Sequence, residues 1–143
     1  SRGYVRALSS CIKDAPLIQP NYLKETIDQN VLIQGVKICR DLLKTSNMKK
    51  ISIKETLPGE NVKTDSEILN FVKNNGATVY HAIGSCRMGI DKDAVVDADL
   101  KLNGVENLRV ADASIMPTMP SGNTNAATLM IAEKASDLIK KDK

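Results

Sequence analysis

The stretch that decides the fold runs from Val105 to Leu138 and has the sequence VENLRVADASIMPTMPSGNTNAATLMIAEKASDL. Its second half predicts a helix over residues 126–140, because apolar residues recur there at helical spacing. The residues on one face of this helix are Leu129, Ala132, Ala135 and Ile139. The polar run 121–125 just before it offers N-cap side chains and free backbone N–H groups at the positive end of the helix dipole.

The single histidine of the chain, His81, opens the segment HAIGSCRMG at residues 81–89. Histidine exchanges protons near neutral pH, which a lone aspartate or lysine does only after a large pKa shift. We expect residues 77–80 to form a strand that delivers His81 at its end, which is a rigid place for a base. His81 is therefore the candidate acid–base group. From its local sequence alone it also fits a histidine that satisfies a buried hydrogen bond.

Together with HAIGSCRMG and the linking segment AVVDADLKLNG at residues 94–104, the stretch from Val105 resembles the C-terminal part of the glucose-methanol-choline (GMC) flavoprotein oxidoreductases. The opening SRGYVRALSS and PNYL at residues 20–23 resemble the upstream pattern of the same family. Several separate motifs thus occur in the family's order over nearly the whole chain. Members of this family oxidise alcohols with FAD, so the resemblance implies a choline-type alcohol dehydrogenase or oxidase.

The resemblance also assigns roles to individual residues. It makes His81 the base that takes the alcohol proton while a hydride passes to the flavin. The second member of the family's active-site pair is histidine in some members and asparagine in others, and here that position is Asn123. Asparagine cannot take up a proton at neutral pH, so His81 is expected to be the sole base. The residues implied to line the cofactor are Tyr80, His81, Asp112, Ala113, Asn123 and Thr124.

The fold implied by the resemblance is α+β in two parts. Residues 1–102 are expected to supply the substrate-domain portion, an antiparallel sheet with flanking helices. Residues 103–143 are expected to return to the FAD-binding domain and to add a strand and the final helix. The glycine-rich run G-x-G-x-x-G that cradles a dinucleotide pyrophosphate is absent from the 143 residues. We therefore expect the main FAD site in an N-terminal portion of the same enzyme, as the partner of this chain, and we expect the isolated chain to be inactive.

Local patterns predict the remaining elements. A strand is expected over residues 1–10, a helix that begins at Asp28 as its N-cap and ends near Ser46, and a strand over residues 49–56. The expected core face of that first helix consists of Leu32, Val36, Cys39 and Leu43. Thr64 and Glu67 form a capping-box pattern for a second helix, which Gly76 should end. Further short strands are expected at residues 95–96, 100–102 and 108–111. Tyr80 also fits a strand residue whose ring packs in the core.

Composition excludes several other classes of protein. The net charge is only +3 and aromatic residues make up 3% of the chain, so the sequence lacks the basic patch and stacking platforms typical of nucleic-acid binding. No apolar run is long enough to predict a transmembrane segment. Three widely spaced cysteines predict neither a disulfide framework nor a metal site, and they favour a cytoplasmic location. The aspartates of residues 91–99 lack the glycine and the final glutamate of a calcium loop.

Two alternatives to alcohol oxidation stay open on the sequence. One is a flavin-retaining lyase acting on cyanohydrin-like substrates, which a few members of the fold family are. The other is a non-catalytic interaction module that lacks the FAD domain. The identity of the alcohol, and the choice between oxygen and another electron acceptor, are not decided by these residues.

Overall fold

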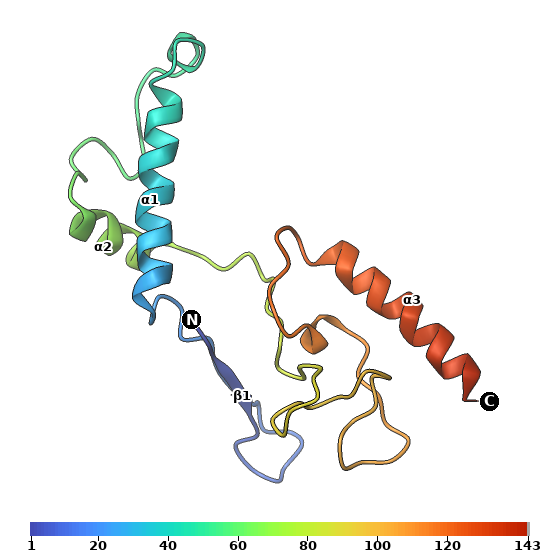
Figure 1. Cartoon of the computed structure of the whole chain (residues 1–143). Helices are drawn as coiled ribbons and strands as arrows, with labels where there is room; N and C mark the ends of the chain where they lie inside the picture. Colours follow the sequence, from blue (N-terminus) through green and yellow to red (C-terminus); the bar gives the residue numbers. More distant parts are fainter. Residues whose placement is uncertain (143) are drawn as a thin grey trace. The chain divides into compact units, whose positions relative to one another are not determined.

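A computed structural model describes residues 1–142 (Figure 1). The chain divides into two compact units, residues 1–77 and the residues from Thr78 onward. The elements of the first unit are β1 (Tyr4–Arg6), β2 (Leu17–Gln19), α1 (Thr26–Leu43), the 3₁₀ helix η1 (Met48–Lys50) and α2 (Asp65–Asn75). Those of the second are the 3₁₀ helix η2 (Ala113–Ile115) and α3 (Asn125–Lys141). Helices combined with an antiparallel strand pair confirm the predicted α+β class.

The first unit opens with a small antiparallel sheet. β1 and β2 pair with Val5 opposite Ile18, so the strand expected within residues 1–10 forms over three residues only. The strand predicted for residues 49–56 was wrong, because η1 occupies its beginning and the rest has no regular structure. A strand needs a neighbour that accepts its hydrogen bonds over several residues, and the described part of this unit supplies none there.

The two helices of the first unit pack against each other, and each buries one isoleucine, Ile33 of α1 and Ile68 of α2. The predicted capping box of α2 is confirmed: the hydroxyl of Thr64 accepts a hydrogen bond from Glu67 N at 3.2 Å, and the Glu67 carboxylate accepts one from Thr64 N at 2.8 Å. Gly76 ends the helix by donating from its backbone N to Val72 O at 2.8 Å. These features depend on neighbouring residues, which is why the sequence reveals them.

The prediction for α1 needs two corrections. Its N-cap is Glu25 rather than Asp28, whose carboxylate instead accepts a hydrogen bond from the hydroxyl of Ser1. The predicted core face is only partly covered, since Leu32 and Cys39 are exposed. With 11 residues against 18, α2 is too short to cover α1, and the uncovered face borders an open apolar hollow.

An ion pair anchors the loop that follows η1 onto α1. Arg40 donates from Nη2 to Glu55 Oε1 at 2.7 Å, and the same carboxylate oxygen accepts from Gly59 N at 3.0 Å. Both side chains are largely shielded from solvent. The hydrogen bonds and charge of Arg40 lower the pKa of Glu55, and those of Glu55 raise the pKa of Arg40. The pair therefore fixes a segment that has no strand or helix of its own.

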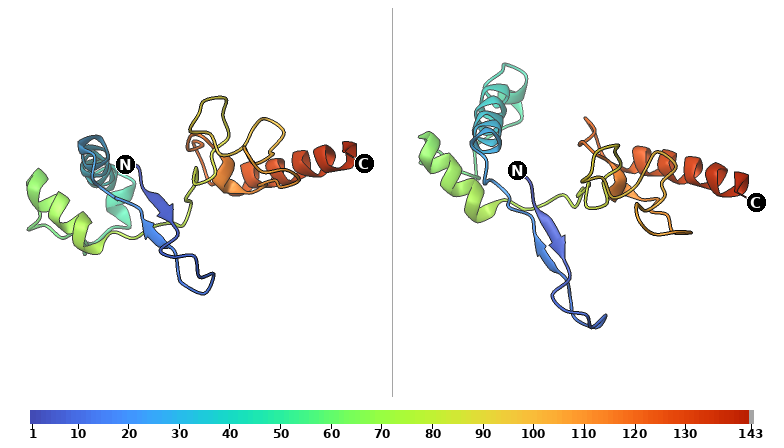
Figure 2. Two further views of the ribbon diagram at one scale, coloured as in Figure 1. Left: turned by 90° about the horizontal axis from the view of Figure 1, so that it is seen from below. Right: turned by 60° about the horizontal axis from the view of Figure 1, so that its bottom comes forward.

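The second unit is built around an aliphatic core. Its buried members are Val96, Leu100, Ile115, Met116, Ile131 and Ala135. Figure 2 shows the loops of this unit gathered along α3. The buried face of α3 includes Ile131 and Ala135, whereas Leu129 and Ile139 of the predicted face are 60% and 46% exposed. Periodicity predicted the helix, but the position of η2 and the loops determines which face is covered.

In place of the short strands predicted for the second unit, the structure has isolated β-bridges. They join Met88 to Val96, Val96 to Leu102 and Lys101 to Arg109. Residues 77–80 form no strand either, and Tyr80 has a left-handed backbone with φ of 60°. The strands predicted at 77–80, 95–96, 100–102 and 108–111 were therefore wrong as regular elements. Val96 and Leu100 are buried, whereas Val79 and Leu108 are exposed, and pairing is confined to isolated positions.

Candidate functional site

Backbone hydrogen bonds hold the segment around His81 beside η2. Cys86 N donates to Ser114 O at 3.0 Å, and Met88 N donates to Ile115 O at 2.8 Å. Gly84 lies between His81 and this ladder with φ of 83°, a left-handed conformation in which a side chain would be strained. Half-buried His81 is thus attached to the core by a turn and two hydrogen bonds on its C-terminal side.

Thr124 contacts the ring of His81. The two residues are 43 positions apart, and Thr124 Oγ1 lies 3.0 Å from His81 Nδ1, within hydrogen-bonding distance. Thr124 is only 8% exposed and occupies the N-cap position of α3. Within residues 1–142 no hydrogen bond to Nε2 of His81 is found, so the described residues leave this nitrogen without a partner.

The N-terminus of α3 is a set of unused hydrogen-bond donors. The first backbone N–H groups of any α-helix have no intrahelical acceptor, and here neither an acidic side chain in the first turn nor a side-chain cap compensates them. The expectation of N-cap side chains in the run 121–125 was therefore wrong. Asn123 and Asn125, on either side of Thr124, are exposed. These donors fit a ligand that gains negative charge, as the pyrimidine end of a flavin does on reduction.

The other residues implied to line a flavin lie in the same unit. Asp112 caps η2 by accepting a hydrogen bond from Ser114 N at 2.8 Å, and Ala113 packs against the core. Tyr80 is 87% exposed, so the alternative that its ring packs in the core was wrong. The structure thus brings His81 and Thr124 into contact, places Asn123 next to Thr124 in the chain, and leaves the ring of Tyr80 accessible.

The carboxylates of the aspartate-rich segment after His81 form hydrogen bonds within that segment. Arg87 donates to both carboxylate oxygens of Asp91, with Nη1 2.8 Å from Oδ2, and this bidentate contact holds the pKa of Asp91 well below its usual range. Asp97 Oδ1 accepts from the backbone N of Asp99 and of Lys101, each at 2.9 Å. These carboxylates stabilise turns. Among residues 1–142 no group of three potential metal ligands was found.

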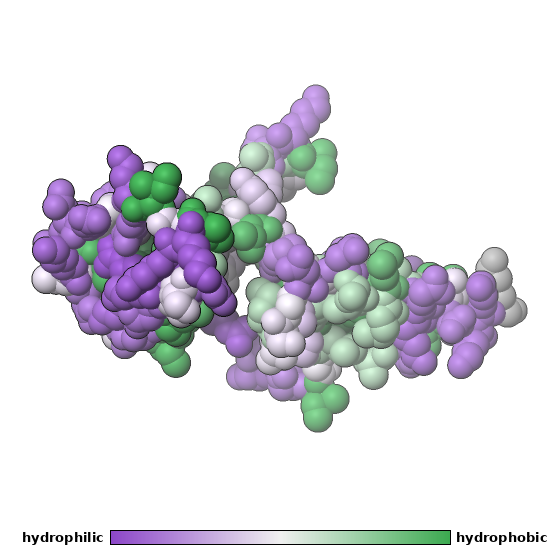
Figure 3. Space-filling model, turned by 90° about the horizontal axis from the view of Figure 1, so that it is seen from above, coloured by the Kyte–Doolittle hydropathy of each residue, from purple (hydrophilic) through white to green (hydrophobic). Residues whose placement is uncertain are grey.

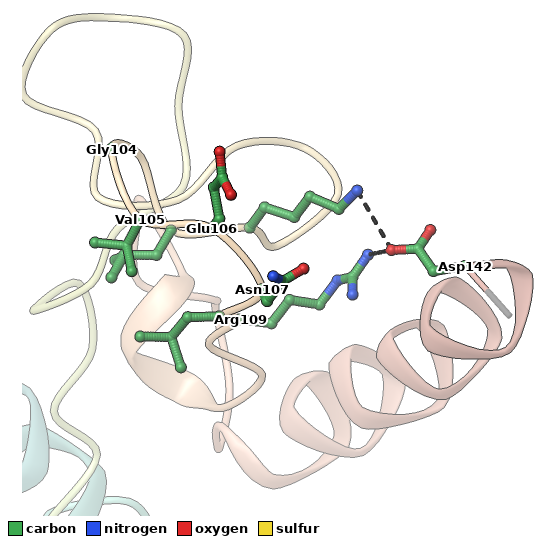
Figure 4. A pocket seen from close by; sticks show the side chains of 9 residues that line it. Gly104, Val105, Glu106, Asn107, Arg109 and Asp142 are labelled. Carbon is green, nitrogen blue, oxygen red and sulfur yellow. Dashed lines mark hydrogen bonds and ion pairs between the residues drawn. The ribbon is translucent and has the colours of Figure 1, made fainter.

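An open pocket at the C-terminal end of α3 is lined by residues 101–102 and 104–109 and by Asp142 (Figure 4). The Asp142 carboxylate lies 2.6 Å from Arg109 Nη2 and 3.3 Å from Lys101 Nζ, and these hydrogen bonds lower its pKa. At 1.5 Å per residue, the length of α3 separates this end from Thr124 by about 25 Å. The pocket therefore lies outside the candidate site, and the ion pairs attach the end of α3 to the loop.

Comparison with known proteins identifies the class. A family model described as GMC oxidoreductase, specific for the C-terminal region, matches residues 1–132. The chain therefore belongs to the GMC oxidoreductase family, as its motifs predicted.

Named relatives agree with this assignment. The chain is 45% identical over 139 residues to an alcohol dehydrogenase [acceptor] of Pseudomonas putida, covering 97% of this chain and 25% of that protein. It is 45% identical over 142 residues to mitochondrial choline dehydrogenase of Mus musculus, covering 98% and 24%. This chain thus spans about a quarter of the length of these relatives.

Solved structures show that the chain also resembles known proteins in its fold. Pyridoxine 4-oxidase from Mesorbium loti superposes with a TM-score of 0.87 at 36% identity, covering 94% of this chain and 26% of that one. An FAD-dependent oxidoreductase from Chaetomium thermophilum superposes with a TM-score of 0.88 at 30% identity, covering 98% and 24%. The chain thus has the fold of the C-terminal part of flavin-dependent oxidoreductases, and FAD is the cofactor of this class. No helix within residues 1–142 is long and apolar enough to cross a membrane.

Proposed function

We propose that this chain forms the C-terminal part of an FAD-dependent enzyme that oxidises the CH–OH group of an alcohol, with His81 as the base. The observation that carries the proposal is the contact between His81 Nδ1 and the N-cap residue of α3 at 3.0 Å. It orients the chain's single histidine at a helix end whose donors are uncompensated. Relatives named as alcohol and choline dehydrogenases support the same chemistry.

Each site residue has a task in this reaction. FAD, when bound, supplies the acceptor for the hydride of the alcohol carbon. His81 takes the hydroxyl proton at Nε2, and general-base catalysis of this kind contributes roughly 10² to 10⁴ in rate. Asn123 orients the substrate oxygen by a hydrogen bond but takes no proton. When FAD is bound, the first N–H groups of α3 together with Tyr80, Asp112, Ala113 and Thr124 would hold it.

Exposed apolar surface supports an N-terminal FAD-binding portion as the partner of this chain. Large apolar side chains are exposed along α1, including Ile27, Val31 and Ile38, and Figure 3 shows apolar residues on the surface of the molecule. Extensive exposed apolar surface marks sites of association. In the complete enzyme, residues 1–102 belong to the substrate domain and residues 103–143 to the FAD-binding domain. Free Cys11, Cys39 and Cys86 support a cytoplasmic location.

The two alternatives are not favoured by the comparisons. Relatives of this chain are named as alcohol and choline dehydrogenases, and the structural neighbours include a pyridoxine oxidase and an aryl-alcohol oxidase. None of these names describes a cyanohydrin lyase or an interaction module. Alcohol oxidation is therefore retained as the proposal.

The test uses the complete protein that contains this chain. The purified flavoprotein is mixed without oxygen with choline, aliphatic alcohols or aromatic alcohols, and the visible flavin absorbance is followed. Bleaching by at least one alcohol is the expected result. Cleavage of a cyanohydrin with no bleaching by any alcohol would establish the lyase instead, and a protein that binds no FAD would refute the enzymatic proposal.

A further inference from the structure

Thr124 occupies a capping position without capping its helix. An N-cap threonine normally has an extended backbone and accepts a hydrogen bond from the N–H two or three residues ahead. Thr64 of α2 does so, with ψ of 158°. Thr124 has φ of −72° and ψ of −13°, and its side chain makes no capping bond. The same residue type at the equivalent position of two helices therefore has two different tasks.

The hydroxyl of Thr124 is directed at His81 instead. Its Oγ1 lies 3.0 Å from Nδ1, and the residue is 8% exposed, so water has little access to compete for this contact. The backbone carbonyl of Thr124 is also occupied, because it accepts from Thr128 N at 2.9 Å and from Thr128 Oγ1 at 2.8 Å. These bonds fix the first turn of α3, and with it the position of the hydroxyl.

The tautomer of His81 decides whether it can act as a base. In neutral histidine one ring nitrogen carries a proton and the other a lone pair, and the partner of one nitrogen determines which. A base that works at Nε2 needs its proton on Nδ1. The Thr124 hydroxyl oxygen can accept from Nδ1–H in this tautomer, and it can accept again after Nε2 has been protonated. A donating hydroxyl would select the opposite tautomer, which has no lone pair at Nε2.

We infer that Thr124 is a positioning residue for His81: its Oγ1 accepts a hydrogen bond from Nδ1–H and holds the ring in the tautomer whose Nε2 can take a proton. The inference rests on the proposed role of His81 as base. It assigns to Thr124 a task separate from cofactor binding and from helix capping.

The test compares Thr124→Val, which keeps the shape but removes the hydroxyl, with Thr124→Ser, which keeps the hydroxyl. The complete enzyme is labelled with ¹⁵N-histidine, and the His81 resonances are assigned by their loss in His81→Ala. We expect Nδ1–H in the unmodified protein and in Thr124→Ser, and a shift toward Nε2–H in Thr124→Val. Flavin reduction should slow roughly fivefold to tenfold in Thr124→Val and recover in Thr124→Ser, as expected for one lost hydrogen bond.

A matched pair of variants separates positioning from capping. Thr64→Val removes a true cap and should lower the melting temperature while leaving flavin reduction unchanged. Thr124→Val should have little effect on the melting temperature, and its reduction rate is compared per bound FAD. An unchanged His81 tautomer in Thr124→Val, or Nε2–H in the unmodified protein, would overturn the inference. Unimpaired reduction in His81→Ala would instead overturn the proposed base, whatever Thr124 does.

Discussion

The packing of α3 predicts that truncation of one buried side chain, Ile131, will destabilise the second unit. Ile131 is 7% exposed and belongs to the core with Val96 and Ile115. Ile131→Ala removes three carbon atoms, worth about 2.4 kcal/mol at 0.8 kcal/mol each, and leaves a cavity that raises the cost further. We expect unfolding of the second unit to become easier by about 3 kcal/mol. Ile139→Ala is the matched control, because Ile139 on the same helix is 46% exposed.

The assay is equilibrium unfolding of the 143-residue chain in urea, followed by the helical circular dichroism signal. Ile139→Ala should cost less than about 1 kcal/mol, since its side chain loses little on truncation. Equal losses for the two variants would show that the buried face of α3 has been assigned incorrectly. The position of Thr124 next to His81 depends on that face, so the same result would undermine the site.

Two further predictions concern the site and the loop anchor. Asn123→Ala should slow flavin reduction in the complete enzyme by roughly ten- to a hundredfold through a lost transition-state hydrogen bond, whereas Asn123→His should keep appreciable activity; unchanged rapid-mixing kinetics in Asn123→Ala would remove Asn123 from the site. Glu55→Gln should lower the free energy of unfolding by about 1 kcal/mol at neutral pH. Because the pairing with Arg40 lowers the pKa of Glu55 from its ordinary 4.5, its stabilisation is present above that value and is lost as the pH falls through the folded-state pKa. The difference in the free energy of unfolding between the unmodified protein and Glu55→Gln, measured in urea, should therefore disappear in acid. A difference that does not depend on pH would contradict the pairing.

What the sequence predicts well here is local. The capping box at Thr64 and Glu67 involves residues three apart, and the helical period of α3 is visible within one window. The family motifs likewise single out His81 and Asn123 from local sequence, and their roles in the site stay a prediction. These features need no knowledge of what lies across the fold.

The failures all involve partners distant in the chain. Asp28 looks like a helix cap, but its carboxylate accepts a hydrogen bond from the hydroxyl of Ser1, 27 positions away. The apolar runs expected as strands find a partner at single positions only, and the covered face of α3 is set by η2 and its neighbouring loops. The hydrogen bond between His81 and Thr124 joins residues 43 positions apart, so a local sequence pattern does not predict it.

The most direct measurement of the central claim is the rate of flavin reduction by alcohol in His81→Ala of the complete enzyme, followed by rapid mixing without oxygen. Loss of the only base should slow this step by roughly two to four orders of magnitude while FAD stays bound. Reduction within a few-fold of the unmodified enzyme would contradict the account, because His81 would then be a structural residue and another group would take the proton.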